Sequence, residues 1–288
     1  MSKILITGSN GFLGSRLSKY LSANHRVIAP LHSEMDFTDI GQVADTFRKE
    51  VPDFVIHCGA VSDTKTCEKN QESSYRINVI GTENIARFCH QYHSKMIFCS
   101  SDQIYSQKAG MEKHTEDEKV NPANEYGKQK LEAEKICSRL CTDAVCLRLT
   151  WMYDFMSYRK NEHKDLFRNI VTAVENGDGI SYPVFDYRGI TYVQYVVENM
   201  EKTFSLPGGI YNFGSENDKN TYETVKAVLN FVGESNYNIT PNTEAFSDHP
   251  RNIIMNTSKL KHFRIEFPNT IQGLKECTIQ YNNCRNKV

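Results

Sequence analysis

A glycine-rich turn near the N-terminus constrains the fold of this chain more than any other feature. The segment ILITGSNGFLGSRL places Gly8, Gly11 and Gly14 at G-x-x-G-x-x-G spacing. The turn follows a short apolar run over residues 3–7 and precedes a helical pattern over residues 12–23. Glycines at such a turn let the backbone approach a pyrophosphate, which the helix N-terminus then stabilises. The segment therefore predicts the first strand–turn–helix unit of a dinucleotide-binding fold.

Further short apolar runs have the same character as residues 3–7. They are apolar on consecutive residues, which is typical of strands buried on both faces of a parallel sheet. They occupy residues 26–29, 53–58, 95–100 and 144–149. Helical patterns over residues 71–92 and 124–140 lie between them. This alternation predicts a doubly wound, Rossmann-like α/β fold with a parallel sheet.

The pattern becomes less regular after about residue 150. Two further helices are expected, one ending at Gly177 and one at Gly233, separated by turn-rich segments. We therefore expect an NAD(P)-binding domain over residues 1–150, with a segment near 185–203 returning to it. Residues 151–288 are expected to form mainly a smaller C-terminal α/β lobe that binds substrate.

The composition excludes several classes of protein. Apolar residues make up 39% of the chain, charged residues 24%, and the formal charge is −1, which gives no electrostatic basis for binding nucleic acid or an anionic membrane. No apolar run reaches the roughly 18 residues of a membrane span, and the apolar run at the N-terminus is too short for the apolar region of a signal peptide. The nine cysteines include no C-x-x-C pair, which favours free thiols over a metal site. We expect a cytoplasmic protein without a metal.

Candidate catalytic residues follow the fourth apolar run. Ser100 and Ser101 stand at its C-terminal end, where ligands bind in open α/β sheets. In NPANEYGKQKLEAEK, Tyr126 and Lys130 share one face of a helix. Reduction of a carbonyl needs a proton donor, and a lysine one turn from a tyrosine is expected to lower the pKa of the phenol. Taken alone, the tyrosine and lysine could equally be a pair on the helix surface. With Ser101 they form a catalytic set only if the strand and the helix meet.

The choice of cofactor depends on the end of the second strand. A carboxylate there would bind the ribose hydroxyls of NAD, but residues 30–33 include neither an acid nor an arginine. His32 and Ser33 are placed to face a 2′-phosphate. The sequence therefore favours NADPH over NADH without excluding NADH.

Nearly the whole chain resembles the dTDP-4-dehydrorhamnose reductase family of the extended short-chain dehydrogenase/reductase superfamily. The resemblance is carried by ILITGSNGFLG, SEMDFTD, PDFVIHCGAVSDTKTCE, INVIGTENIA, FCSSDQIYS, NEYGKQKLEAEK, LRLTWMYD and HPRNIIMNTSKLKHFRIEFPNTIQGLKE. It implies NAD(P)H-dependent reduction of a 4-keto group on a nucleotide-linked deoxysugar.

The resemblance also implies roles for individual residues. Ser101, Tyr126 and Lys130 would be catalytic, and Asn78, inside the helical pattern, would bend its helix and hold a water near the lysine; otherwise Asn78 is a tolerated polar residue. The implied cofactor contacts are Gly8, Gly11, Phe12, Leu13 and Gly14 at the pyrophosphate, Asp36 and Phe37 near the adenosine, and Gly59, Ala60 and Val61 after the third strand.

Four residues after position 150 are implied substrate contacts. Trp151 matches a tryptophan beside the sugar, and Arg251 and Asn252 match a motif of the substrate lobe. Arg188 stands in DYRGITY, where this chain departs from the family pattern. The alternative interpretation is that Trp151 is a core residue at the boundary of the lobe.

Two other functions use the same motifs. An NAD-dependent sugar-nucleotide epimerase or dehydratase would keep and regenerate its cofactor, and Asp102 after Ser101 is an acid of the kind that dehydratases carry. A regulatory relative would bind NADP without turnover. No Glu follows Asp102, which argues against a dehydratase, and the intact set of Ser101, Tyr126 and Lys130 argues against a regulatory relative without turnover. A homodimer is a further possibility.

Overall fold

The computed structural model describes residues 1–105, 111–159, 162 and 165–285. The chain divides into two compact units. Unit 1 comprises residues 1–105, 119–149 and 197–212. Unit 2 comprises residues 106–118, 150–196 and 213–288. Each unit is therefore assembled from segments that are distant in the sequence.

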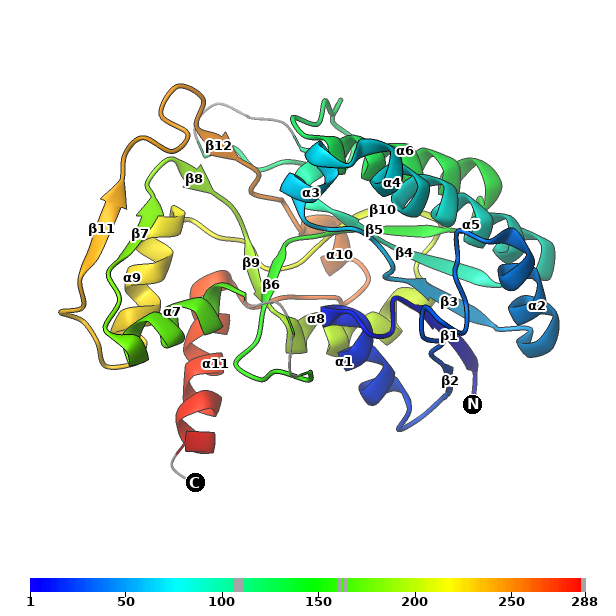
Figure 1. The fold of residues 1–288 in the computed structure, drawn as a ribbon, viewed down its shortest axis with the longest axis horizontal. Helices are drawn as coiled ribbons and strands as arrows, with labels where there is room; N and C mark the ends of the chain where they lie inside the picture. The colour runs from blue at the N-terminus through cyan, green and yellow to red at the C-terminus, as the bar shows by residue number, and fades with distance from the viewer. Residues whose placement is uncertain (106–110, 160–161, 163–164, 286–288) are drawn as a thin grey trace. The chain divides into compact units, whose positions relative to one another are not determined.

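A six-stranded sheet forms the centre of unit 1 (Figure 1), in the order β10-β5-β4-β3-β1-β2. Its strands are β1 (Lys3–Thr7), β2 (Arg26–Ile28), β3 (Phe54–His57), β4 (Lys95–Ser101), β5 (Val145–Leu149) and β10 (Gly209–Phe213). The neighbouring pairs from β2 to β5 are all parallel. Strands β4 and β5 are almost wholly buried, as strands with helices on both faces must be.

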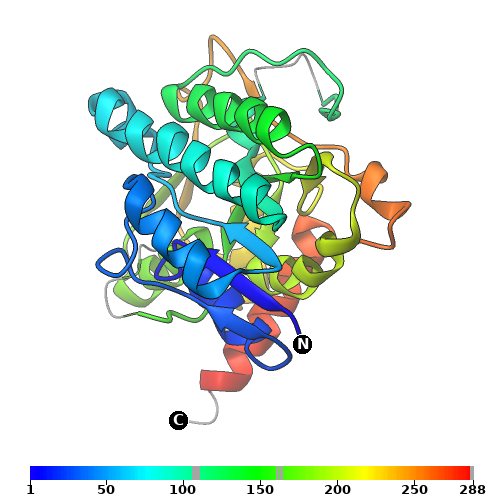
Figure 2. The ribbon, with the colours of Figure 1, turned by 90° about the vertical axis from the view of Figure 1, so that its right-hand side faces the viewer.

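Helices cover this sheet, and α5 and α6 run side by side along it (Figure 2). The helical elements of unit 1 are α1 (Phe12–Leu21), α2 (Ile40–Glu50), α3 (Thr64–Lys69), α4 (Gln71–Tyr75), η1 (Arg76–Ile80), α5 (Gly81–Tyr92), η2 (Asp102–Ile104), α6 (Glu125–Leu140) and η3 (Glu201–Ser205). Apolar side chains of α2, α5 and α6, among them Phe47, Ile85 and Ala133, pack on Val55 and Phe98 of the sheet. This architecture confirms the predicted fold class.

The strand register brings the C-terminal ends of the central strands to one edge. Thr7 pairs with His57, and His57 pairs with Phe98 on the next strand. Ser101 pairs with Leu149. The turns that follow β1, β3 and β4 consequently leave the sheet at the same edge, which is where an open α/β sheet binds its ligands.

The long helix expected over residues 71–92 is interrupted. Between α4 and α5, residues Arg76–Ile80 form a π-helical turn. Such turns are rare, and they occur frequently at functional sites. Asn78 lies in this turn, and its backbone carbonyl accepts a hydrogen bond of 2.8 Å from the Thr82 hydroxyl.

Among its described residues, unit 2 contains three small parallel pairs of strands. These are β6 (Trp151–Tyr153) with β9 (Ile190–Tyr192), β7 (Ile180–Pro183) with β11 (Ile239–Asn242), and β8 (Asp186–Tyr187) with β12 (Arg251–Asn252). Its helices are α7 (Leu166–Asn176), α9 (Thr221–Phe231), α10 (Ser258–Lys261) and α11 (Thr270–Arg285), and α8 (Val193–Met200) continues into unit 1. Helices α7 and α9 agree with the two predicted helices.

Side-chain caps explain where α7 and α9 begin. Asp165 accepts from the Arg168 amide at the start of α7. Asn220 and Glu223 form a reciprocal capping box at the start of α9. Gly177 ends α7 in the left-handed conformation. Among the helices of the described residues, none combines the length and the apolar character needed to cross a membrane.

Candidate active site

The glycine turn has the close backbone packing that a pyrophosphate site requires. Gly8 has a φ of 64°, and a Cβ there would lie 2.7 Å from the backbone of Gly59. A Cβ on Gly14 would lie 2.2 Å from the Gly8 carbonyl oxygen. Helix α1 begins after Gly11 without a side-chain cap. Its first backbone N–H groups therefore face the turn as donors, which fits the phosphates of a dinucleotide.

A buried chain of hydrogen bonds connects the end of β1 with the π-turn. The Thr7 hydroxyl lies 2.6 Å from His57 Nδ1, and His57 Nε2 lies 3.0 Å from the Thr82 hydroxyl. Since Thr82 donates its proton to the Asn78 carbonyl, it must accept from His57, so Nε2 carries the ring proton. Thr7 then donates to Nδ1. Burial, assisted by the charge of Lys130, lowers the pKa of His57 to about 3 and keeps the imidazole neutral.

The side chain of Asn78 holds the loop that follows β3. Its Oδ1 accepts from the Val61 amide at 2.8 Å, and its Nδ2 donates to the Val61 carbonyl at 3.0 Å. Nδ2 also donates to Gln129 Oε1 on α6 at 2.7 Å. The π-turn agrees with the expectation that Asn78 bends its helix. The amide nitrogen, however, is used by Val61 and Gln129, and the role of Asn78 in holding a water near Lys130 stays a prediction.

Strand β4 and helix α6 meet, which brings Ser101 and Tyr126 together. Helix α6 begins after Asn124, whose side chain accepts from the Gly127 amide at 2.8 Å and donates to Gln103 at 3.0 Å. The phenol of Tyr126 is buried, and the Ser101 hydroxyl is near enough to it to lower its pKa. The Ser101 hydroxyl also lies 3.3 Å from Asp102 Oδ1. The predicted surface-pair alternative for Tyr126 is thereby excluded, because its side chain is only 8% exposed.

Lys130 is buried against the end of β4. Its Nζ donates to the Cys99 carbonyl at 2.8 Å and lies 5.8 Å from the centre of the Tyr126 ring. Burial lowers the pKa of Lys130. Burial also raises the pKa of Tyr126 well above its usual value, an effect that the Ser101 hydroxyl opposes and the charge of Asp102 increases. The expected lowering of the phenol pKa is therefore not found, because desolvation is the dominant effect.

The predicted adenosine residues lie on the loop between β2 and α2. Asp36 uses its carboxylate locally, accepting from the Thr38 amide and hydroxyl at 2.8 Å each. The Phe37 ring packs edge-on against His57, with ring centres 5.2 Å apart. His32 is exposed on the turn after β2. Phe37 thus fixes this loop against the sheet, and His32 remains accessible to a ligand.

The four predicted substrate residues all lie in unit 2. The Arg188 guanidinium stacks over the Trp151 ring at 5.0 Å. Arg251 donates to both carboxylate oxygens of Asp186, at 2.7 and 2.8 Å. Asn252 is buried and donates to the Glu112 carbonyl. Arg251 and Asn252 thus have structural contacts within unit 2, and substrate contacts for all four residues stay a prediction.

Several buried polar residues near the candidate site were not predicted. His57 and Gln129 belong to the contacts described above. Glu134 accepts from Arg148 through two hydrogen bonds of 3.1 and 2.9 Å, which fasten α6 to β5. Glu134 stands one turn after Lys130 on the buried face, and this spacing was a signal in the sequence. The partners of His57 and Gln129 are too distant in the sequence for any local pattern to indicate these contacts.

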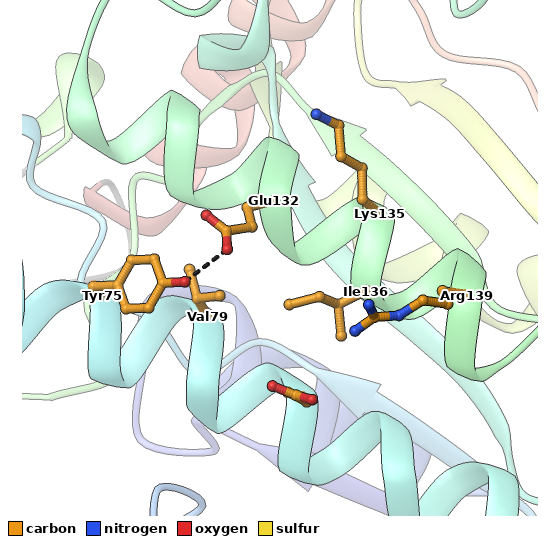
Figure 3. Close-up of a pocket in the computed structure, with 7 residues that line it drawn as sticks. Tyr75, Val79, Glu132, Lys135, Ile136 and Arg139 are labelled. Atoms are coloured by element: carbon orange, nitrogen blue, oxygen red, sulfur yellow. Dashed lines mark hydrogen bonds between the residues drawn. The ribbon is translucent and has the colours of Figure 1, made fainter.

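A pocket of about 300 Å³ lies elsewhere in unit 1. Figure 3 shows its lining side chains between the helix of Tyr75 and Val79 and the helix α6. The remaining lining residues are Glu83, Glu132, Lys135, Ile136 and Arg139. The phenol of Tyr75 donates to Glu132 at 2.6 Å. None of the predicted site residues lines this pocket. Over the described part of the chain, no cluster of His, Cys, Asp or Glu is arranged to hold a metal.

Known proteins resemble this chain in sequence and in fold. The chain is 26% identical over 249 residues to the spore coat polysaccharide biosynthesis protein SpsK of Bacillus subtilis (strain 168), covering 86% of each protein. It is 28% identical over 239 residues to a dTDP-4-dehydrorhamnose reductase of Aggregatibacter actinomycetemcomitans, covering 80% of this chain and 79% of that one. A crystal structure of dTDP-4-dehydrorhamnose reductase from Bacillus anthracis str. Ames in complex with NADP has the same fold. Its TM-score is 0.88 at 22% identity, over 97% of this chain and 98% of that one.

The family model described as RmlD substrate binding domain matches residues 2–283. The match includes both the glycine turn and the C-terminal segment from which the sequence predicted the family. Since the match extends over nearly the whole length, this chain belongs to the RmlD substrate binding domain family.

Proposed function

We propose that this protein is an NAD(P)H-dependent oxidoreductase that reduces the 4-keto group of a nucleotide-linked deoxysugar. The observation that carries the proposal is the meeting of Ser101, Tyr126 and Lys130 at the same sheet edge as the glycine turn. Relatives named dTDP-4-dehydrorhamnose reductase support dTDP-4-dehydrorhamnose as the first substrate to test.

Tyr126 is suited to act as the general acid. NADPH, when bound, supplies the hydride to the carbonyl carbon. The buried phenol keeps its proton, because its pKa is raised, and so it is available to donate to the oxygen that becomes an alkoxide. The hydroxyl of Ser101, which lies near the Tyr126 phenol, orients that oxygen.

Lys130 stabilises the charge that appears when Tyr126 has given up its proton. The ammonium is held by the Cys99 carbonyl, 5.8 Å from the Tyr126 ring centre. Two opposite unit charges at a separation of this order attract each other by a few kcal/mol at an effective dielectric constant of about 20. We therefore propose that the lysine acts through the charge of the tyrosinate rather than by binding substrate.

The test is reduction of dTDP-4-dehydrorhamnose by the purified chain with NADPH. The proposal predicts oxidation of one NADPH for each product molecule, and a product heavier than the substrate by two hydrogens. Unchanged NADPH with an isomerised or dehydrated sugar would identify an epimerase or dehydratase instead. Stabilisation of the chain by NADPH without any turnover, over a panel of 4-keto nucleotide sugars, would favour the regulatory function.

We further propose NADPH as the preferred cofactor, because His32 is exposed at the end of β2 and residues 30–33 carry no acid. Comparison of the dissociation constants of NADPH and NADH tests this preference, and tighter NADH binding would reverse it. The homodimer stays a prediction, which analytical ultracentrifugation of the purified chain tests directly.

A further inference from the structure

Gln129 stands beside Lys130 on α6, and its side chain is 3% exposed. Its Oε1 accepts from Asn78 Nδ2 at 2.7 Å, and its Nε2 donates to the Ser74 hydroxyl at 2.8 Å. A buried amide retains little freedom once both ends are bonded. Gln129 thus ties α6 to the π-turn and to α4, at the level of the Tyr126 and Lys130 pair.

The hydrogen bonds in this cluster have only one possible direction. The Val61 amide can only donate, so Asn78 must direct its oxygen to Val61 and its nitrogen to Gln129. Gln129 then presents its oxygen to Asn78 and its nitrogen to Ser74, whose hydroxyl donates to the Gln71 carbonyl at 3.1 Å. Each of these bonds joins a donor to an acceptor. The cluster consequently defines one arrangement of Val61 relative to α6.

We propose that Gln129 is a positioning residue that sets the register between the Gly59–Val61 loop and the catalytic face of α6. The proposal rests on the proposed function. The cofactor is expected to lie along the Gly59–Val61 loop. A carbonyl that is to be reduced must contact this cofactor and at the same time be within reach of the Tyr126 hydroxyl. In the cluster described above, the Asn78–Gln129 bond connects the Gly59–Val61 loop with α6. A displacement of about 1 Å between reacting groups costs up to about a hundredfold in rate.

Gln129→Met is the informative variant, because it keeps the length and bulk of the side chain and removes both hydrogen bonds. We expect kcat to fall about tenfold or more. The affinity for NADPH should fall by less than kcat does, because the glycine turn is untouched and only the contacts of the Gly59–Val61 loop are loosened. Ser74→Ala is the matched control: it removes one hydrogen bond of Gln129 and leaves the bond to Asn78. It should keep kcat within about twofold of the wild type.

Hydrogen exchange of the Val61 amide gives a readout that needs no substrate. This N–H is bonded to Asn78, so loss of Gln129 should speed its exchange, while Ser74→Ala should leave it unchanged. If exchange is faster in Gln129→Met but the wild type reduces no sugar, the proposed function is refuted, while the connection between Gln129 and the Gly59–Val61 loop is retained. If both the exchange of the Val61 amide and kcat are unchanged in Gln129→Met, the positioning role of Gln129 is refuted. It is also refuted if Ser74→Ala changes exchange and kcat as much as Gln129→Met does. Should Gln129→Met fail to fold, Gln129→Asn, which is shorter by one methylene, is measured in the same way.

Discussion

The buried imidazole of His57 makes the stability of this protein depend on pH. In the unfolded chain its pKa has the ordinary value of 6.5, whereas in the folded protein burial lowers the pKa to about 3. Between these values the unfolded state binds a proton that the folded state does not bind. The contribution of His57 to stability is therefore fully present above pH 6.5 and is lost as the pH falls toward 3.

The size of the effect follows from proton linkage. Lowering the pH from about 7 to about 5 costs about 2 kcal/mol in the free energy of unfolding through this one residue. A folded pKa one unit higher gives nearly the same loss, because it would still lie below this range. The variant His57→Gln keeps a donor and an acceptor between Thr7 and Thr82 but does not titrate.

Urea denaturation of the wild type and of His57→Gln at both pH values measures the effect. The wild type should lose about 2 kcal/mol more than the variant, whatever the carboxylates contribute to both. The reasoning is refuted if the two proteins lose equal stability over this range, because His57 would then titrate equally in the folded and unfolded states.

The remaining predictions concern packing, a buried ion pair and the glycine turn. Gly81→Ala places a Cβ 2.4 Å from the Phe37 ring. Although alanine has the better helix propensity, this clash should lower the free energy of unfolding, measured by urea denaturation, by about 1–3 kcal/mol. Adding Phe37→Leu should restore most of the lost stability. Glu134→Gln leaves the Arg148 guanidinium buried without its ion-pair partner. It should lower the free energy of unfolding by about 3–5 kcal/mol in the same measurement, and a loss below about 1 kcal/mol would contradict this expectation. Gly8→Ala forces a side chain onto a φ of 64° and should weaken NADPH binding about tenfold or more by calorimetry; unchanged affinity would exclude the turn from the cofactor site.

The central sheet was predictable because its strands are buried on both faces. Runs such as residues 95–100 are apolar on consecutive positions, and β4 is buried along almost its whole length. The small strands of unit 2 were not predicted individually, because pairs such as Asp186–Tyr187 with Arg251–Asn252 are too short to show any periodicity. Helix α2 was also missed, although Asp39 caps its first turn.

The candidate site was predictable where chemistry is local in the sequence. The glycine turn and the Tyr126 and Lys130 spacing are such features, and the meeting of β4 with α6 follows from the fold. Contacts between residues far apart in sequence, such as His57 with Thr82 or Asn78 with Gln129, have no local signal. The direction of the Tyr126 pKa shift was wrong for a related reason, since desolvation depends on the whole surroundings of the phenol.

The most direct test of the central claim is the turnover of Tyr126→Phe, compared with that of Tyr75→Phe. Both variants remove one phenolic oxygen, but Tyr75 donates to Glu132 away from the proposed catalytic set. With dTDP-4-dehydrorhamnose and NADPH, the account predicts that kcat falls at least about a hundredfold in Tyr126→Phe and is retained in Tyr75→Phe, with NADPH binding intact in both. Full turnover by Tyr126→Phe would contradict the account.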